Sequence, residues 1–253
     1  MGNDAIATRG TTALARPDYI KKDDARGTEN ITTADIKFPA LRLAQAMSPE
    51  VKRADPAYLE GLREGELFNS ITREVYGEDA VHLIIVNQLG HRNTQFDPND
   101  RNVVLESNIP DDDQRCQFTV EVRDGRQVRL KPLATKFYDY LVLLILPNRD
   151  PQLMTLSLKS TQLKKAVALN SMLKLSKLAS FAHLLKATPI AEKKGNNSWY
   201  GWRFDSAGWV TEEQYNLASK HFDQMQSKTK DIAAAIAVEP EPPAADADDD
   251  IPF

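Results

Sequence analysis

Apolar and polar residues alternate in short runs along most of the chain, a pattern that predicts a protein built mainly of β-strands. Alternating or wholly apolar runs predict strands at residues 38–45, 66–71, 80–87, 103–105, 136–146, 153–158, 181–191 and 198–205. A hairpin is predicted around Asp124-Gly125, a typical two-residue turn, because apolar residues alternate on both sides of it.

Two segments have the spacing of amphipathic helices instead. Residues 161–178 carry apolar side chains at helical intervals, with lysines on the opposite side. A second helix is predicted from Thr211 to about Ala235, with Glu213 near a capping-box position. Many short strands, one internal helix and a closing helix are the element order of a small antiparallel barrel. We therefore expect a mainly β protein with helices, an OB-fold-like antiparallel barrel with insertions.

The apolar pattern also divides the chain into three parts. Residues 1–30 contain few apolar side chains and show no period, which predicts a flexible N-terminal segment. Residues 31–235 form the expected folded domain. Residues 236–253 are rich in proline, alanine and acids, which predicts a disordered acidic tail. With 253 residues and 42% hydrophobic content, the chain has enough apolar material for one sizeable core.

Several protein classes are excluded by simple features. No apolar run approaches the roughly 18 residues of a membrane span, and the N-terminus lacks the basic and apolar regions of a secretory signal. Cys116 is the single cysteine, which excludes an intrachain disulfide and a cysteine-based zinc cluster. We expect a cytoplasmic protein.

The formal net charge of −4 hides a strong separation of charge along the sequence. Residues 1–120 carry a net charge of −6, whereas residues 121–203 hold 15 Lys and Arg against 5 Asp and Glu, net +10. The last 15 residues, 239–253, hold six acids and no base. A basic block inside an acidic protein predicts a face that binds a polyanion.

The acidic tail ends in three apolar residues, which a tail that serves only solubility does not need. An aromatic tip can fill an apolar pocket while the acids meet a basic rim, so the tip is expected to bind a protein partner. The candidate partner-binding residues are Asp248, Asp249, Asp250, Ile251, Pro252 and Phe253.

This ending, DDDIPF, resembles the C-terminal tip of bacterial single-stranded DNA-binding proteins (SSB). The resemblance implies an OB-fold body that binds single-stranded DNA, and a tip that recruits replication and repair proteins. The layout departs from the usual bacterial pattern, because the globular part spans about 200 residues and the linker is short. It is more similar to phage-encoded single-stranded DNA-binding proteins, and the departure puts the familiar tetramer in doubt.

Binding single strands without sequence preference requires cations for the phosphates and flat rings for the bases. The basic block supplies both. The candidate nucleic-acid-binding residues are Arg123, Arg126, Arg129, Lys131, Lys136, Tyr138, Tyr140, Lys159, Lys164, Lys165, Lys193, Lys194, Trp199 and Arg203.

Strand alternation sorts the aromatic residues into faces. Tyr200, Trp202 and Phe204 share one face, and Trp199 and Arg203 share the other, which we expect to face solvent. Aromatic rings in barrel strands belong to the core more often than to a ligand site, so a core role remains the alternative for each ring.

In the strand at 136–146, Lys136, Tyr138 and Tyr140 share a face opposite Phe137 and Leu141. The first three are therefore assigned to the binding face, and the same core alternative applies to both tyrosines.

Motifs of catalysis are missing from the sequence. No phosphate-binding loop or dinucleotide-binding fingerprint occurs, and the four histidines are scattered. Asp111, Asp112 and Asp113 are the best candidates for a two-metal nuclease centre, but consecutive residues of a loop cannot all face one site. We expect a protein that is not an enzyme and uses no cofactor or metal.

The predicted function is sequence-tolerant binding of single-stranded DNA in replication, recombination or repair. A recombination annealing or mediator protein is the alternative, and a metal-dependent nuclease a more distant one.

Overall fold

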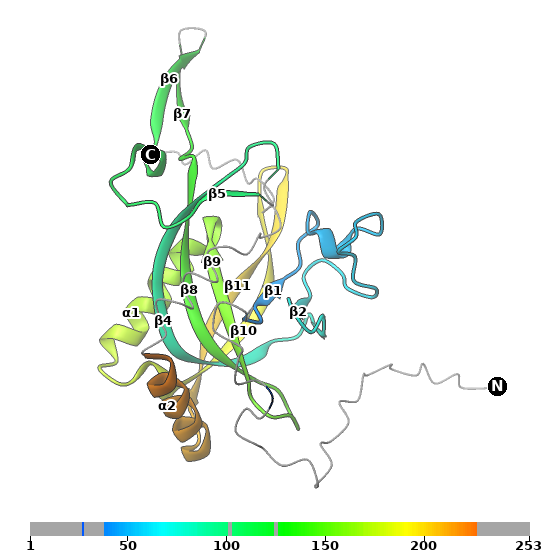
Figure 1. The fold of residues 1–253 in the computed structure, drawn as a ribbon, viewed down its shortest axis with the longest axis vertical. Helices are drawn as coiled ribbons and strands as arrows, with labels where there is room; N and C mark the ends of the chain where they lie inside the picture. The colour runs from blue at the N-terminus through cyan, green and yellow to red at the C-terminus, as the bar shows by residue number, and fades with distance from the viewer. Residues whose placement is uncertain (1–26, 28–37, 101–102, 124–125, 227–253) are drawn as a thin grey trace, which may run out of the picture.

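A computed structural model describes residue 27 and residues 38–100, 103–123 and 126–226. Its centre is an antiparallel sheet in the order β11-β10-β4-β8-β9 (Figure 1). The strands are β4 (Val81–Phe96), β8 (Ala134–Ile145), β9 (Gln152–Lys159), β10 (His183–Lys194) and β11 (Asn197–Trp209). A sixth strand, β5 (Val104–Glu106), pairs with the end of β4. Because β10 returns beside β4 after β4, β8 and β9 have run in sequence, these four strands form a Greek key.

A second, three-stranded sheet lies beside the β9 edge. It consists of β1 (Leu41–Leu43), β2 (Leu67–Asn69) and β3 (Val75–Gly77). An isolated parallel bridge joins Ala40 to Thr155 of β9, and the Thr155 amide donates to the carbonyl of Pro39 at 2.8 Å. The small sheet therefore continues from the edge of the large one.

The described strands do not close into a barrel, which corrects that part of the sequence prediction. The large sheet ends at β9 on one side and at β11 on the other. Two glutamine side chains occupy the β11 edge. Gln45 accepts from the Tyr200 amide and donates to the Tyr200 carbonyl, both at 2.9 Å, and Gln162 accepts from the Trp202 amide at 2.9 Å. Side chains thus satisfy polar groups that a further strand would otherwise pair.

Two helices cover the sheet. Helix α1 (Leu163–Leu175) follows a 3-10 turn, η4 (Ser160–Gln162), and buries Ala166 and Leu169 in the main core with Tyr140, Leu156 and Trp202. Helix α2 (Glu212–Gln226) packs Ala218 on the other face of the sheet, against Ile84 and Leu143. Each face of the central sheet therefore has its own apolar cluster. The remaining 3-10 turns are η2 (Pro49–Val51), η3 (Gln114–Cys116) and η5 (Ser180–Ala182).

A two-stranded hairpin, β6 (Thr119–Arg123) and β7 (Arg126–Leu130), projects beyond the rest of the fold at the top of Figure 1. It is inserted between β4 and β8 and forms a sheet of its own. Apart from Leu130, every residue of its two strands is exposed. We call residues 118–131, described except for 124–125, the arm.

The mainly β, antiparallel prediction and the two predicted helices are confirmed, with shifts at the element ends. The prediction missed β3 and the second half of β4, where buried polar residues such as Arg92 and Asn93 hide the strand pattern. Apart from Gly27, the predicted flexible N-terminal segment lies outside the described residues, as do the acidic tail and the end of the second predicted helix. Among the described residues, no helix is long and apolar enough to cross a membrane.

Candidate nucleic-acid interface

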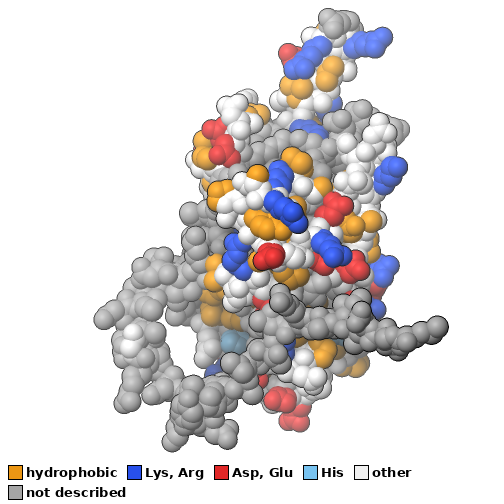
Figure 2. Space-filling view, turned by 90° about the vertical axis from the view of Figure 1, so that its right-hand side faces the viewer, with side chains coloured by type: hydrophobic (Ala, Val, Ile, Leu, Met, Phe, Trp, Pro, Cys, Tyr) orange, Lys and Arg blue, Asp and Glu red, His pale blue; other side chains and the backbone are white. Residues whose placement is uncertain are grey.

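The arm brings four of the predicted cations together on one projecting element. Arg123, Arg126, Arg129 and Lys131 are all exposed there, and Glu121 is the single acid among the arm's described residues. Glu121 is bonded to Arg123, with its Oε2 2.9 Å from Nε. Figure 2 shows the Lys and Arg side chains of the arm at the top of the molecule, whereas basic and acidic side chains intermingle over the body on this face.

The pairing register divides the arm into two faces, since opposite residues of an antiparallel pair share a face. Val120 lies opposite Arg129, and Val122 lies opposite Gln127. Val120 is 62% exposed and Val122 67% exposed, which is unusual for β-branched residues in a strand. Arg123 and Arg126 lie opposite each other on the second face.

Phe118 is a candidate site residue that the sequence analysis did not select. The residue is 48% exposed, and the Arg129 guanidinium carbon lies 3.9 Å from the centroid of its ring. Cation–π contact holds the ring beside a charge that suits a phosphate. The signal was present in the sequence, because Phe118 alternates with Val120 and Val122 at the start of the predicted hairpin.

The two tyrosines of β8 have different environments, and the assignment of Tyr140 to the binding face was wrong. Tyr140 is fully buried, and its hydroxyl donates to Asn170 Oδ1 at 2.8 Å. Burial raises its pKa above the usual value for tyrosine. Tyr140 is therefore a core residue and cannot stack on a base. Tyr138 is only partly buried, with Lys136 Nζ 5.9 Å from its ring centroid.

Lys159 lies on the opposite face of the same strands. Its Nζ is 5.3 Å from the ring centroid of Phe137, which is fully buried. Arg92 lies 3.9 Å from the same ring and forms a buried ion pair with Asp139, Nε to Oδ2 2.9 Å. Lys136 and Lys159 are therefore separated by the sheet rather than gathered on one face.

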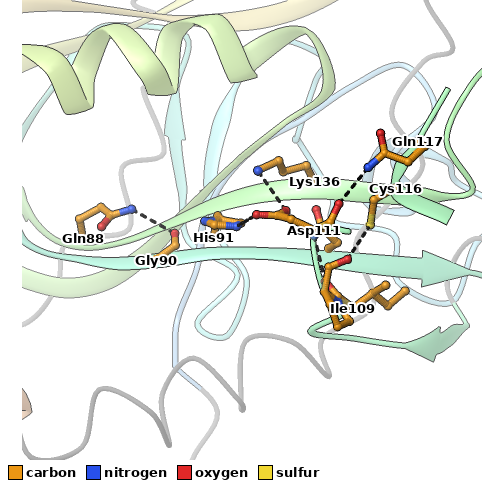
Figure 3. A network of polar contacts seen from close by, with 10 residues as sticks. Gln88, Gly90, His91, Ile109, Asp111, Cys116, Gln117 and Lys136 are labelled. Carbon is orange, nitrogen blue, oxygen red and sulfur yellow. Dashed lines mark hydrogen bonds and ion pairs between the residues drawn. The ribbon is translucent and has the colours of Figure 1, made fainter. Parts of the chain in front are cut away.

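Lys136 also belongs to a polar network that joins β4 and β8 to the loop before the arm (Figure 3). Asp111 receives hydrogen bonds from Asn93 Nδ2 at 2.8 Å and Lys136 Nζ at 3.2 Å, and its Oδ2 lies 2.7 Å from His91 Nε2. The bonds from Asn93, His91 and Lys136 hold the Asp111 pKa below its usual range. The Asp111 carboxylate therefore ties the base of the arm to the sheet.

The neighbouring acids do not converge on a common point. Asp113 binds its own neighbour Arg115, with Oδ2 2.7 Å from Nη2, and this bond lowers the Asp113 pKa to about 2. Among the described residues, no group of three or more His, Cys, Asp or Glu is placed to hold a metal ion. The arrangement of Asp111, Asp112 and Asp113 thus gives the nuclease alternative no support.

Trp199 lies on β11 beside an acid that the sequence analysis did not consider. Its indole Nε1 donates to Glu192 Oε2 at 2.7 Å, and the other carboxylate oxygen, Oε1, is ion-paired with Lys165. Trp199 is partly exposed, whereas Trp202 on the opposite face is buried in the core. The predicted sorting of these two rings is therefore correct.

The other predicted cations of this region are on the surface. Lys193 and Lys194 are exposed at the tip of the β10–β11 hairpin, next to the Gly195-Asn196 turn. Arg203 is exposed and bonded to Asp205, Nε to Oδ2 3.0 Å, and Lys164 is exposed at the start of α1. The tip residues Asp248–Phe253 lie outside the described residues.

The predicted residues thus form three groups: the arm, the β8–β9 strands, and the β10–β11 hairpin with the start of α1. In Figure 1 the arm and the turn between β10 and β11 lie toward the same end of the molecule. The combination of exposed cations and accessible rings is chemically suited to a flexible polyanion that carries bases.

Comparison with known proteins gives a match to a family model. Residues 9–231 match the family model described as Pam3 phage gp34-like protein. No curated protein and no solved structure matches the chain. Since the match extends over most of the sequence, the chain belongs to the Pam3 phage gp34-like protein family.

Proposed function

We propose that this chain binds single-stranded DNA without strong sequence preference, protects exposed strands in replication, recombination or repair, and is not an enzyme. The observation that carries the proposal is the arm, which presents exposed Arg129 beside the exposed ring of Phe118 and exposed Arg123 and Arg126 on its second face. Cations neutralise phosphates and ring faces stack on bases of any identity, so this combination suits single strands of any sequence.

The strand order supports an OB-fold-like plan for the same site. The OB-fold is a partly open, five-stranded Greek-key barrel, and it binds oligonucleotides through the face of its second and third strands and through two loops. If β4, β8, β9, β10 and β11 are its five strands, the arm lies in the first of these loops and Lys193–Lys194 in the second. The OB-fold assignment is thus part of the proposal.

The tail adds a second function to the proposal. Asp248–Phe253 recruit replication or repair proteins, because an acidic segment with an aromatic tip suits a pocket with a basic rim. The family description refers to a phage, so the place of action would be the cytoplasm of the infected host cell.

The arm provides the test. Arg123→Gln with Arg126→Gln removes two exposed cations, whereas Lys174→Gln with Lys220→Gln makes the same charge change on the exposed surfaces of α1 and α2. Binding of a labelled dT oligonucleotide is measured at several salt concentrations. The arm variant should lower the slope of log affinity against log salt by about 1.4, since each phosphate contact on a single strand contributes about 0.7.

The control variant should leave that slope unchanged. If both variants change binding equally, the arm has no special role and the proposal fails. A strand-annealing assay with the wild-type chain separates simple coating from the annealing alternative.

A further inference from the structure

Glu192 is an exception in a strongly basic part of the chain. Residues 151–204 hold nine Lys and Arg, and Glu192 is their single acid. An acid within a phosphate-binding region repels the ligand unless its charge is compensated. Its position next to Trp199 therefore requires a physical explanation.

The contacts of Glu192 explain its position next to Trp199. The residue lies directly opposite Trp199 in the β10–β11 ladder. Its two carboxylate oxygens have different partners: Oε2 accepts from the Trp199 indole at 2.7 Å, and Oε1 is paired with Lys165 of α1. The first contact fixes the edge of the indole, and the second compensates the charge.

Gly201 makes room for this arrangement. A Cβ atom at position 201 would lie 2.9 Å from both Cδ and Oε2 of Glu192, and 2.5 Å from Nε2 of Gln162. The backbone of Gly201 does not need a positive φ, so close packing is the reason for glycine here. The carboxylate therefore lies against β11, in a space that a larger residue would fill.

We propose that Glu192 is a positioning residue for nucleic-acid binding, which holds the Trp199 indole so that its ring face is presented to a base. Lys165 compensates the Glu192 charge and Gly201 provides the space. This inference rests on the proposed function, in which Trp199 stacks on a base. Fixing a side chain before binding removes part of the cost of ordering it, about 2- to 12-fold in affinity.

Two variants isolate this role. Glu192→Ala and Glu192→Gln remove the same charge, but only glutamine keeps a side-chain oxygen that can accept from the indole. Electrostatic effects on DNA binding are therefore matched between them. Glu192→Val, which suits a strand and also lacks the acceptor, replaces the alanine variant if that variant does not fold.

Two measurements are made on the full chain. The first is the indole ¹H–¹⁵N NMR signal of Trp199, assigned with Trp199→Phe. We expect it to stay near its wild-type position in Glu192→Gln and to move in Glu192→Ala. The second is the affinity for a dT oligonucleotide, which should be about 2- to 12-fold lower for Glu192→Ala than for Glu192→Gln.

Equal affinities of the alanine and glutamine variants would overturn the inference. Trp199→Ala should weaken dT binding about 5- to 150-fold if the ring stacks on a base. If Trp199→Ala binds like the wild type while the arm variant binds weakly, the inference fails and the proposed function stands. If the wild-type chain does not bind single strands, the proposed function itself fails.

Discussion

Tyr138 and Tyr140 lie two residues apart on one face of β8, yet they have different environments. Tyr140 is fully buried beneath α1 and bonded to Asn170, whereas Tyr138 remains partly exposed beside Lys136. Their variants should therefore affect different properties, one stability and the other binding.

Tyr140→Phe should lower the free energy of unfolding by about 1–2 kcal/mol, because Asn170 loses its hydrogen-bond donor in a part-buried site. Its affinity for single strands should stay unchanged. Tyr138→Ala should instead weaken binding by about 1–3 kcal/mol if the ring stacks on a base. Urea denaturation and oligonucleotide titration measure the two quantities. An unchanged free energy of unfolding in Tyr140→Phe would contradict the stabilising role of the hydrogen bond to Asn170.

The carboxyl groups at the base of the arm give a pH prediction. Hydrogen bonds lower the pKa of Asp111 and bring that of Asp113 to about 2, below the ordinary value of about 3.9. A group with a lowered pKa stabilises the fold above its unfolded pKa, and that contribution is lost as pH falls through the folded pKa. The contacts of both carboxylates should therefore persist at pH 4, and those of Asp113 should break only near pH 2. Side-chain carboxyl ¹³C NMR would show titration near pH 4 if these bonds are absent.

At the scale of elements, the edge of β11 is protected by side chains instead of a strand. Gln45 satisfies both polar groups of Tyr200, and Gln162 satisfies the amide of Trp202. Gln45→Ala should lower the free energy of unfolding by about 1–3 kcal/mol, because it leaves part-buried backbone groups unpaired. Equal denaturation midpoints for wild type and alanine variant would contradict this role.

The arm should be separable from the rest of the fold. None of its residues belongs to an apolar core cluster of the described chain. Replacing residues 119–130 with a short glycine-rich turn should leave the melting temperature nearly unchanged, whereas binding of single strands should fall strongly. A large drop in the melting temperature would show that the arm stabilises the fold.

Most of the observed strands could be predicted from local sequence patterns, but part of one long strand could not. Short alternating runs and wholly apolar runs predicted most strands and the hairpin. The wholly apolar runs mark the parts of β4 and β8 that are buried on both faces of the sheet. The second half of β4 escaped this rule, since Arg92, Asn93 and Thr94 are buried with hydrogen-bonding partners.

At the site, alternation separated Trp199 from Trp202 correctly, since the two lie on opposite faces of one strand. It could not tell Tyr138 from Tyr140, because residues that share a face can differ in depth along the strand. The pairing of Glu192 with Trp199 depends on the β10–β11 register, and that of Glu192 with Lys165 on where α1 packs. Tertiary contacts of this kind are not contained in local sequence patterns.

For the whole molecule, the separation of charge along the chain underlies the proposed competition between the acidic tail and DNA. The block at residues 121–203 carries a net charge of +10, and the last 15 residues carry −6. Deleting residues 246–253 should tighten DNA binding modestly, most clearly at low salt, where the attraction between tail and body is least screened. An unchanged affinity at low salt would show that the tail does not compete with DNA.

The apolar tip should act separately from the acids. Phe253→Ala keeps every acid of the tail, so it should leave DNA affinity nearly unchanged and abolish capture of host replication or repair proteins. Co-precipitation from host extract compares the variant with the wild type. Undiminished capture of the same proteins would remove Phe253 from the partner site.

The central claim is preference for single strands, and one competition measurement tests it most directly. The wild-type chain, bound to a labelled dT oligonucleotide, is titrated with unlabelled single strand or with blunt duplex of equal length at roughly 50 and 200 mM salt. We predict that the single strand competes much better than the duplex, and that affinity falls steeply between the two salt concentrations. Equal or better competition by the duplex would contradict the proposed function.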